Sequence, residues 1–227
     1  MKKIINYTTP RTLFAVAALA FATCLSACTK NDGDVTTPAT SAYVMATNTA
    51  EASDAQDFYA DNNKVNSSAL AYTQSTAYIK VAAGNHNLQF KSSANASVNS
   101  SATLNAQSGK YYSVFYTDDK STVTVTDDHT APQSGKARVR FINLSSALNS
   151  AVDFGVSGGN KLITTLAYRA ASAYAEVDAA TKFSLYIAGS TTVKLDMPVT
   201  ISAGHIYTIY ISGATAATIH YNVLVQD

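Results

Sequence analysis

The sequence repeats itself, and this duplication constrains the fold more than any other feature of the chain. Residues 41–48, SAYVMATN, correspond to residues 136–143, KARVRFIN, at a spacing of 95 positions. The segments 70–72 and 166–168 both read LAY, and residues 108–117 align with residues 203–212 at the first spacing again. Because the matches keep register over nearly the whole body, we interpret the chain as two copies of one structural unit.

Each copy has the residue pattern of β-strands. Short runs rich in Val, Ile, Tyr and Thr are separated by Gly, Asn and Ser, and the apolar positions alternate or form runs of five to eight residues. The clearest predicted strands cover residues 42–48, 88–91, 111–116, 137–143, 182–188, 192–197, 206–212 and 218–225. Many short strands at regular spacing predict an all-β protein made of two tandem immunoglobulin-like antiparallel β-sandwich domains.

The boundary between the copies is expected where this alternation stops. Charged residues, Pro132 and Gly135 interrupt the pattern between Asp127 and Gly135, which we interpret as a solvated linker. The predicted first repeat is 41–130, the linker 131–136 and the second repeat 137–227. Asp127, Asp128 and His129 lack the spaced acids and central glycine of a calcium loop, and the four histidines are dispersed, so we expect no metal site.

The N-terminus has the order of a lipoprotein signal peptide. Lys2, Lys3 and Arg11 precede an apolar run of about ten residues, which is too short to span a membrane as a helix. The run leads into the tetrapeptide LSAC, residues 25–28, which resembles a lipobox. We therefore predict a signal peptide at 1–27, lipidation of Cys28, and a flexible polar tether at 28–40.

This anchor predicts a location and limits the partners. A lipid on Cys28 makes a membrane the first partner, and the charged residues just after it resemble the tags of Gram-negative lipoproteins sent to the outer membrane. We expect an outer-membrane protein facing the periplasm or the cell surface. Removing the leader leaves thirteen basic against fifteen acidic side chains, a net charge of −2, which argues against a nucleic-acid partner.

A family resemblance is carried mainly by the second copy. Residues 137–143, ARVRFIN, are followed by Val152 and Asp153, by Tyr168 and Tyr174, and by residues 203–208, AGHIYT. This series resembles the bacterial domain of unknown function DUF4397, found in lipoproteins in one or more copies. The first copy departs from it with Tyr43, Ala46 and Ser113 in place of Arg, Phe and Thr. The resemblance implies an extracytoplasmic β-sandwich of unassigned role and brings no catalytic residues.

One segment imitates an enzyme motif. Residues 155–159, GVSGG, have the spelling of a nucleophile elbow around Ser157, but that motif needs a strand-to-helix turn and a later histidine. A strand and glycines surround Ser157, so we favour a β-turn. We predict that the protein is not an enzyme, with no catalytic residues and no cofactor.

Three pairs of positions are kept in both copies and are candidate structural or ligand-contacting sites. They are Asn48 with Asn143, Asp57 with Asp153, and Tyr78 with Tyr174. Asn and Asp commonly hydrogen-bond the backbone of their own turns, so for these two pairs we favour a loop-holding role.

Aromatic residues leave two interpretations open. The chain has fourteen Tyr and no Trp. Neighbouring rings on a strand point to opposite faces, so one ring of each pair at 111–112 and 115–116 is a candidate for exposure. The tyrosines then serve either the core or a face that binds glycan or protein.

The leading functional hypothesis is a non-catalytic cell-envelope lipoprotein acting in adhesion, envelope assembly or protein interaction. The alternative is a carbohydrate-binding lipoprotein of a glycan-uptake system. A secreted hydrolase using Ser157 is the third and weakest candidate.

Overall fold

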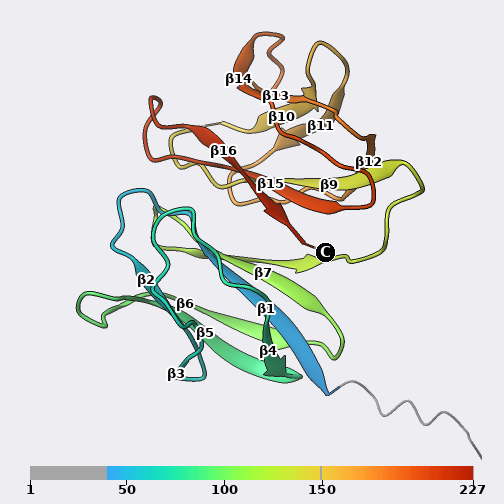
Figure 1. The fold of residues 1–227 in the computed structure, drawn as a ribbon. Coiled ribbons are helices and arrows are strands. Elements are labelled where there is room, and N and C mark those ends of the chain that lie inside the picture. Colours follow the sequence, from blue (N-terminus) through green and yellow to red (C-terminus); the bar gives the residue numbers. More distant parts are fainter. Residues whose placement is uncertain (1–39, 149, 227) are drawn as a thin grey trace, which may run out of the picture. The chain divides into compact units, whose positions relative to one another are not determined.

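The computed structural model describes residues 40–148 and 150–226, and within them it contains sixteen strands and no helix (Figure 1). The all-β prediction is confirmed. Cys28, the signal peptide and nearly all of the predicted tether lie outside the described residues. Within the part of the chain that the structure describes, no helix has the length and hydropathy of a membrane span.

The first sandwich, β1 to β8, consists of two four-stranded sheets. One sheet has the order β4-β1-β7-β8, with β1 at Ser41–Asn48, β4 at Ile79–Ala82, β7 at Tyr111–Tyr116 and β8 at Thr122–Asp127. The other has the order β3-β2-β5-β6, with β2 at Gln56–Ala60, β3 at Asn63–Lys64, β5 at Gly84–Ser92 and β6 at Val98–Ala106. Phe58, Leu88 and Val114 belong to the apolar core between these sheets.

The second sandwich, β9 to β16, repeats this strand order. One sheet is β12-β9-β15-β16, with β9 at Lys136–Asn143, β12 at Ala175–Asp178, β15 at Ile206–Ser212 and β16 at His220–Val225. The other is β11-β10-β13-β14, with β10 at Val152–Val156, β11 at Lys161–Leu166, β13 at Phe183–Ile187 and β14 at Val193–Met197. At the centre of its core, Phe141 stacks on Phe154 and makes an edge-to-face contact with Phe183.

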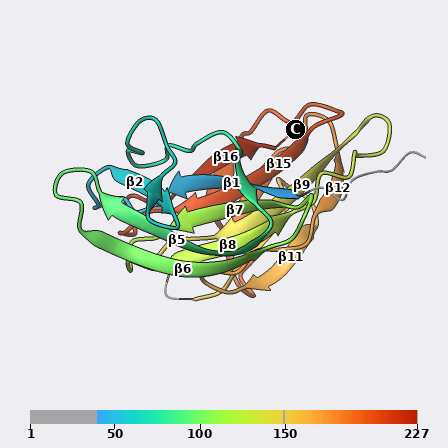
Figure 2. The ribbon, with the colours of Figure 1, turned by 90° about the horizontal axis from the view of Figure 1, so that it is seen from below.

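Each sandwich contains one parallel strand pair, which the sequence analysis did not foresee. β1 pairs with β7 and β9 pairs with β15 in parallel, and the other strand pairs are antiparallel (Figures 1 and 2). The pair joins strands far apart in the sequence, and sequence alternation carries no information about strand direction. Every strand predicted from the sequence is present, with ends within a few residues of the predicted limits.

The two sandwiches pack against each other through a third apolar cluster. Along β7, Tyr112 and Val114 face the core of the first sandwich, whereas Phe115 belongs to a cluster shared with the second sandwich. The cluster contains Phe115, Val123, Ile142, Leu144 and Tyr210. The four sheets therefore form four layers, and the two middle sheets are covered on both faces, as Figure 1 shows for β7 and β15.

This arrangement corrects two expectations. Phe115 and Tyr116 were expected to leave one ring exposed, yet both are buried because the second sandwich covers the outer face of β7. Asp127 was placed in a solvated linker, yet its side chain is fully buried at the end of β8. Residues 128–135 connect β8 to β9. The domain limits 41–130 and 137–227 stay a prediction, because the sandwiches share this cluster.

Candidate functional site: a pocket in the first sandwich

The two sandwiches differ in the segment that follows Lys64 of β3 and its equivalent Lys161 at the start of β11. In the second sandwich, residues 162–165 read LITT and continue β11 along β10, with Leu162 and Ile163 packed on the core. In the first sandwich, residues 65–69 read VNSSA, and β3 ends at Lys64. Asn, Ser and Ala favour strands less than Leu, Ile and Thr do, and the first segment is one residue longer. It therefore leaves the sheet edge.

An asparagine side chain holds the departing segment. The backbone N–H of Phe58 donates to Oδ1 of Asn66 at 2.8 Å, and Nδ2 of Asn66 donates to the carbonyl of Ser68 at 2.7 Å. The amide oxygen takes the place of the backbone partner that a continuing strand would have supplied to the N–H of Phe58, while Val65 and Leu70 still bond β2 through their backbone. Asn66 thus keeps the edge of β2 satisfied while the chain bulges outward.

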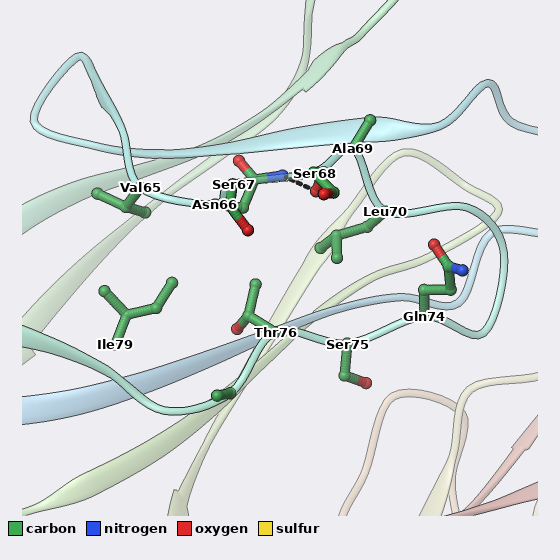
Figure 3. Close-up of a pocket in the computed structure, with 11 residues that line it drawn as sticks. Val65, Asn66, Ser67, Ser68, Ala69, Leu70, Gln74, Ser75, Thr76 and Ile79 are labelled. Atoms are coloured by element: carbon green, nitrogen blue, oxygen red, sulfur yellow. Dashed lines mark hydrogen bonds between the residues drawn. The ribbon is translucent and has the colours of Figure 1, made fainter.

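The bulge leaves a pocket of about 510 Å³ between residues 65–70 and the returning segment 74–79 (Figure 3). Val65, Leu70 and Ile79 supply aliphatic surface on the two arms, and all three pack with the core of the first sandwich. The other lining residues are small or neutral: Asn66, Ser67, Ser68, Ala69, Gln74, Ser75, Thr76 and Ala77.

The polar groups of the pocket fall into two sets. Thr76 and Ser75 are used structurally, because Oγ1 of Thr76 accepts from the N–H of Ala46 at 3.0 Å and the Ser75 hydroxyl is 2.9 Å from that of Thr47. The hydroxyls of Ser67 and Ser68 are exposed at the rim and have no protein partner among the described residues. With no charged or aromatic residue in its lining, the pocket suits a neutral ligand with an aliphatic group.

The repeated asparagines hold equivalent turns. Nδ2 of Asn48 donates to the carbonyl of Leu70 at 3.0 Å, and Nδ2 of Asn143 donates to that of Leu166 at 3.3 Å. The carbonyl of each asparagine also accepts a backbone N–H, from Thr73 and Arg169 respectively. These bonds support the loop-holding interpretation, and a ligand role for either asparagine stays a prediction.

Each repeated aspartate forms an ion pair with a lysine of its own hairpin. Lys64 lies 2.7 Å from Asp57, and Lys161 lies 2.6 Å from Asp153. Asp153 also accepts the N–H groups of Thr165 at 2.7 Å and of Gly189 at 3.0 Å. Burial opposes ionisation of Asp153, but these donors together hold its pKa below the ordinary value. Both lysines lie on the second strand of their hairpin, Lys64 in β3 and Lys161 in β11, and the sequence analysis overlooked this repeated position.

The repeated tyrosines lie at the junction of the sandwiches. The hydroxyl of Tyr78 donates to Oδ2 of Asp127 at 2.8 Å, and that of Tyr174 donates to Oε1 of Gln226 at 2.8 Å. Burial raises the pKa of both tyrosines. Neither lines the pocket, so the structure separates these positions from it.

Ser157 lies in the turn between β10 and β11. Its hydroxyl is 2.9 Å from that of Ser184, which in turn donates to Asp196 at 3.0 Å. No histidine takes part in these contacts of Ser157. Among residues 40–148 and 150–226, no group of three or more His, Cys, Asp or Glu side chains is placed to hold a metal.

The sequence analysis did not identify Arg140, which lies at the junction of the two sandwiches, as an important position. Arg140 is buried and forms an ion pair with Asp127 of the first sandwich. Its Nη1 also donates to the carbonyl of Thr126 at 2.9 Å. An arginine inside a strand whose neighbours are apolar was the available signal, because a buried arginine needs a partner.

Comparison with known proteins gives the following matches. No curated protein matches the chain. A solved structure, the family 26 carbohydrate-binding module from Eubacterium rectale Amy13K in complex with maltoheptaose, is 13% identical with a TM-score of 0.27. That match covers 81% of this chain and 96% of the other. The family model for the domain of unknown function DUF4397 matches residues 42–154, from β1 to the third residue of β10. The chain belongs to this family.

Proposed function

We propose that this protein is a non-catalytic cell-envelope lipoprotein, anchored through Cys28 in the outer membrane, that binds another protein through the pocket of its first sandwich. The tether and lipid would hold the body at the membrane surface, facing either the periplasm or the exterior. The second sandwich would serve as the support on which the first is mounted.

The observation that carries this proposal is the difference between the two copies in the segment that follows Lys64 and Lys161. The second copy fills the position with Leu162 and Ile163, whereas the first has Val65 and Asn66 there, followed by small residues, and leaves a pocket. The Asp–Lys ion pair of each hairpin is retained beside this position. The loss of a core-filling side chain in one copy supports a binding role for the space that it leaves.

The second sandwich also indicates the ligand chemistry. There, the equivalent space holds aliphatic side chains of an extended protein segment. An aliphatic side chain presented by a partner protein would meet Val65, Leu70 and Ile79 in the pocket, while the rim hydroxyls of Ser67 and Ser68 would bond its backbone. We therefore place a neutral, extended protein segment in the pocket.

A carbohydrate is the alternative ligand, and it would use the same rim hydroxyls. Sugar rings bind best on exposed aromatic faces. In the described part of the chain, every Tyr and Phe side chain is buried or half-buried, and the pocket lining contains none. This distribution favours the protein ligand. A hydrolase using Ser157 is the remaining alternative, and the turn contacts of Ser157 with Ser184 give that reading no support.

The test exchanges the segment that differs. Residues 65–69 of the soluble body, residues 29–227, are replaced with LITT from the second copy, which we expect to close the pocket. Both proteins are screened against a random peptide display library and a glycan array. Peptides with aliphatic residues should be enriched by the original protein and at least tenfold less by the exchanged one. The control, Ser93→Leu on an exposed turn, should bind like the original.

Other outcomes contradict specific parts of the proposal. Binding to glycans alone, lost on the exchange, would replace the protein ligand with a sugar. Peptide enrichment that survives the exchange, or no enrichment on either array, would remove the pocket as the site. Hydrolysis of an ester, peptide or glycoside panel that Ser157→Ala abolishes would make the protein an enzyme. Circular dichroism and thermal melts establish that the exchanged protein is folded.

The anchor is tested separately from the pocket. Mass spectrometry of the N-terminal peptide should find acyl chains on Cys28, and the Cys28→Ser variant should leave the membrane fraction. An unmodified Cys28 would overturn the anchoring. Protease treatment of intact cells separates the two faces of the membrane, because only a surface-exposed body is digested.

A further inference from the structure

The face through which the sandwiches meet is built from equivalent positions of the two copies. Strand β7 of one and β15 of the other contribute Ser113 and Phe115 against Thr208 and Tyr210. The other equivalent pairs that lie at the junction are Tyr72 with Tyr168, Tyr78 with Tyr174, and Asp127 with Gln226. An interface in which each side offers the same patch has the form of a two-fold dimer.

The bonds across the junction follow this pseudo-symmetry. The hydroxyl of Tyr72 is 3.0 Å from that of Ser212 and 3.2 Å from Nε2 of His220, both in the second sandwich. Its counterpart Tyr168 lies toward the first sandwich, where burial and the Asp119 carboxylate raise its pKa to about 12. Each copy thus extends the same tyrosine to the opposite copy.

A polar network occupies one end of the junction. Nε2 of Gln226 donates to the hydroxyl of Tyr78 at 3.1 Å and to that of Ser113 at 3.2 Å. Oε1 of Gln226 accepts from Thr208 at 2.6 Å. Ser113 in turn donates to Asp127 at 2.8 Å. The network joins the two copies through side chains that occupy equivalent positions in each.

One buried charged pair breaks the symmetry. Arg140 of the second sandwich bonds Asp127 of the first, and both side chains are almost completely buried, with 3% and 0% exposure. The equivalent positions of the opposite copies hold Met45 and Gln226, which are neutral. The buried part of the junction therefore contains one ion pair where a symmetric one would contain two or none, and a second pair between Arg169 and Asp119 lies at the exposed rim.

This asymmetry determines which copies fit together. Pairing two first sandwiches would bury two Asp127 carboxylates beside Met45 with no cation. Pairing two second sandwiches would bury two Arg140 guanidinium groups beside Gln226 with no anion. A buried charge without its partner is strongly unfavourable, so only the unlike pairing leaves both charges compensated.

We infer that this face is a heterotypic docking face, and that its partner is the opposite sandwich of a second copy of this chain whenever the internal pairing opens. The first sandwich of one chain binds the second sandwich of another chain and does not bind another first sandwich. Residues 128–135 are the hinge for such an exchange, since they alone connect the paired sheets.

The experiment cuts the folded protein at this hinge. Residues 131–134 of the body 29–227 are replaced with a protease recognition sequence, and the protein is cleaved after folding. Native mass spectrometry should find the fragments as a one-to-one complex. Mixing cleaved protein with an isotopically labelled preparation should give unlike complexes of mixed label and no like pairs. Fragments that separate at micromolar concentration, or like pairs in the mixture, would overturn the inference.

Two variants test the charge argument. Arg140→Met should weaken association of the fragments at least about thirtyfold, as expected for removing one member of a buried pair. Adding Asp127→Gln to it gives each copy the residues found in the other, so association should return and like pairs should now form. An unchanged affinity in the single variant, or restored discrimination in the double variant, would contradict the assignment. The double variant stays informative if the single one unfolds.

Discussion

The two sandwiches share one strand order but use it differently. The second completes its edge with a full strand, β11, whose Leu162 and Ile163 cover the core. The first reduces that strand to two residues and covers the gap with the side chain of Asn66. This topology thus tolerates a shortened edge strand when a side-chain amide bonds the exposed backbone N–H of the neighbouring strand, and the space gained becomes a pocket.

The two copies also differ at the junction, in charge and not in strand structure. There the copies have kept their shape and changed their charges, with Arg140 and Asp127 facing each other while Met45 and Gln226 are neutral. Divergence at the edge leaves a pocket on one copy. Divergence at the junction places one buried ion pair between the two copies.

Breaking the ion pair between Arg140 and Asp127 should have the largest effect on stability. We expect Arg140→Met to lower the free energy of unfolding by about 3–5 kcal/mol, because Asp127 stays buried without its cation. Chemical denaturation followed by circular dichroism measures the change. Adding Asp127→Gln should recover most of the loss. A single variant as stable as the original protein would show that the pair contributes nothing to joining the sandwiches.

The two aspartate–lysine pairs should differ in strength. Asp153 is almost fully buried and accepts three hydrogen bonds, whereas Asp57 faces a lysine with 40% side-chain exposure. We expect Asp153→Asn to cost about 2 kcal/mol and Asp57→Asn less than about 1 kcal/mol. Equal costs for the two variants would contradict the assignment.

Lowering the pH should reduce the stability difference between the Asp153→Asn variant and the original protein. Because the pKa of Asp153 is lowered in the folded protein, its contribution is present above the unfolded value near 4 and is lost as the pH falls through the folded value. The difference between Asp153→Asn and the original protein should therefore shrink below pH 4. Thermal melts from pH 7 to pH 2 measure it.

The smallest effect is expected where the copies differ by one hydroxyl. Tyr210 and Phe115 are equivalent and their rings meet at the junction with centroids 5.7 Å apart, and the buried Tyr210 hydroxyl has no hydrogen-bond partner. We expect Tyr210→Phe to raise the free energy of unfolding by up to about 1 kcal/mol at pH 7. A loss of stability would instead indicate a bond that this hydroxyl makes.

Alkaline pH should widen that difference. Burial raises the pKa of Tyr210, so the folded protein keeps the hydroxyl neutral while the unfolded chain ionises it above about pH 10. The free energy of unfolding of the original protein therefore falls as the pH rises above the pKa of Tyr210 in the unfolded chain. The phenylalanine variant has no hydroxyl at this position and does not lose stability in this way. Denaturant melts at pH 8 and pH 11 compare the two.

Sequence reasoning succeeded where the signal is local. The strands at β9 and β15 are runs of β-branched and aromatic residues, and the structure places both within a residue of the predicted limits. It failed to find β6, Val98–Ala106, whose Asn, Ser and Ala residues have low strand propensity. That strand exists because β5 pairs with it over most of its length, a tertiary contribution that outweighs propensity.

The candidate site was beyond sequence reasoning for a related reason. Asp57 and Asp153 were found because both copies keep them. The pocket arises from what one copy has lost, and a search for shared residues passes over such a difference. Asp127 was misplaced because one acidic residue at the end of a strand resembles a linker until the partner that buries it, Arg140, is known.

The sequence by itself determined the duplication, the all-β class and the membership of DUF4397, because alternation and register are written along the chain. Only the tertiary structure decided that the middle sheets are covered on both faces, that Arg140 meets Asp127, and that residues 65–79 enclose a pocket. The physical reason is that these features depend on which surfaces meet, and contacts between distant segments leave no periodic mark in the residues that make them.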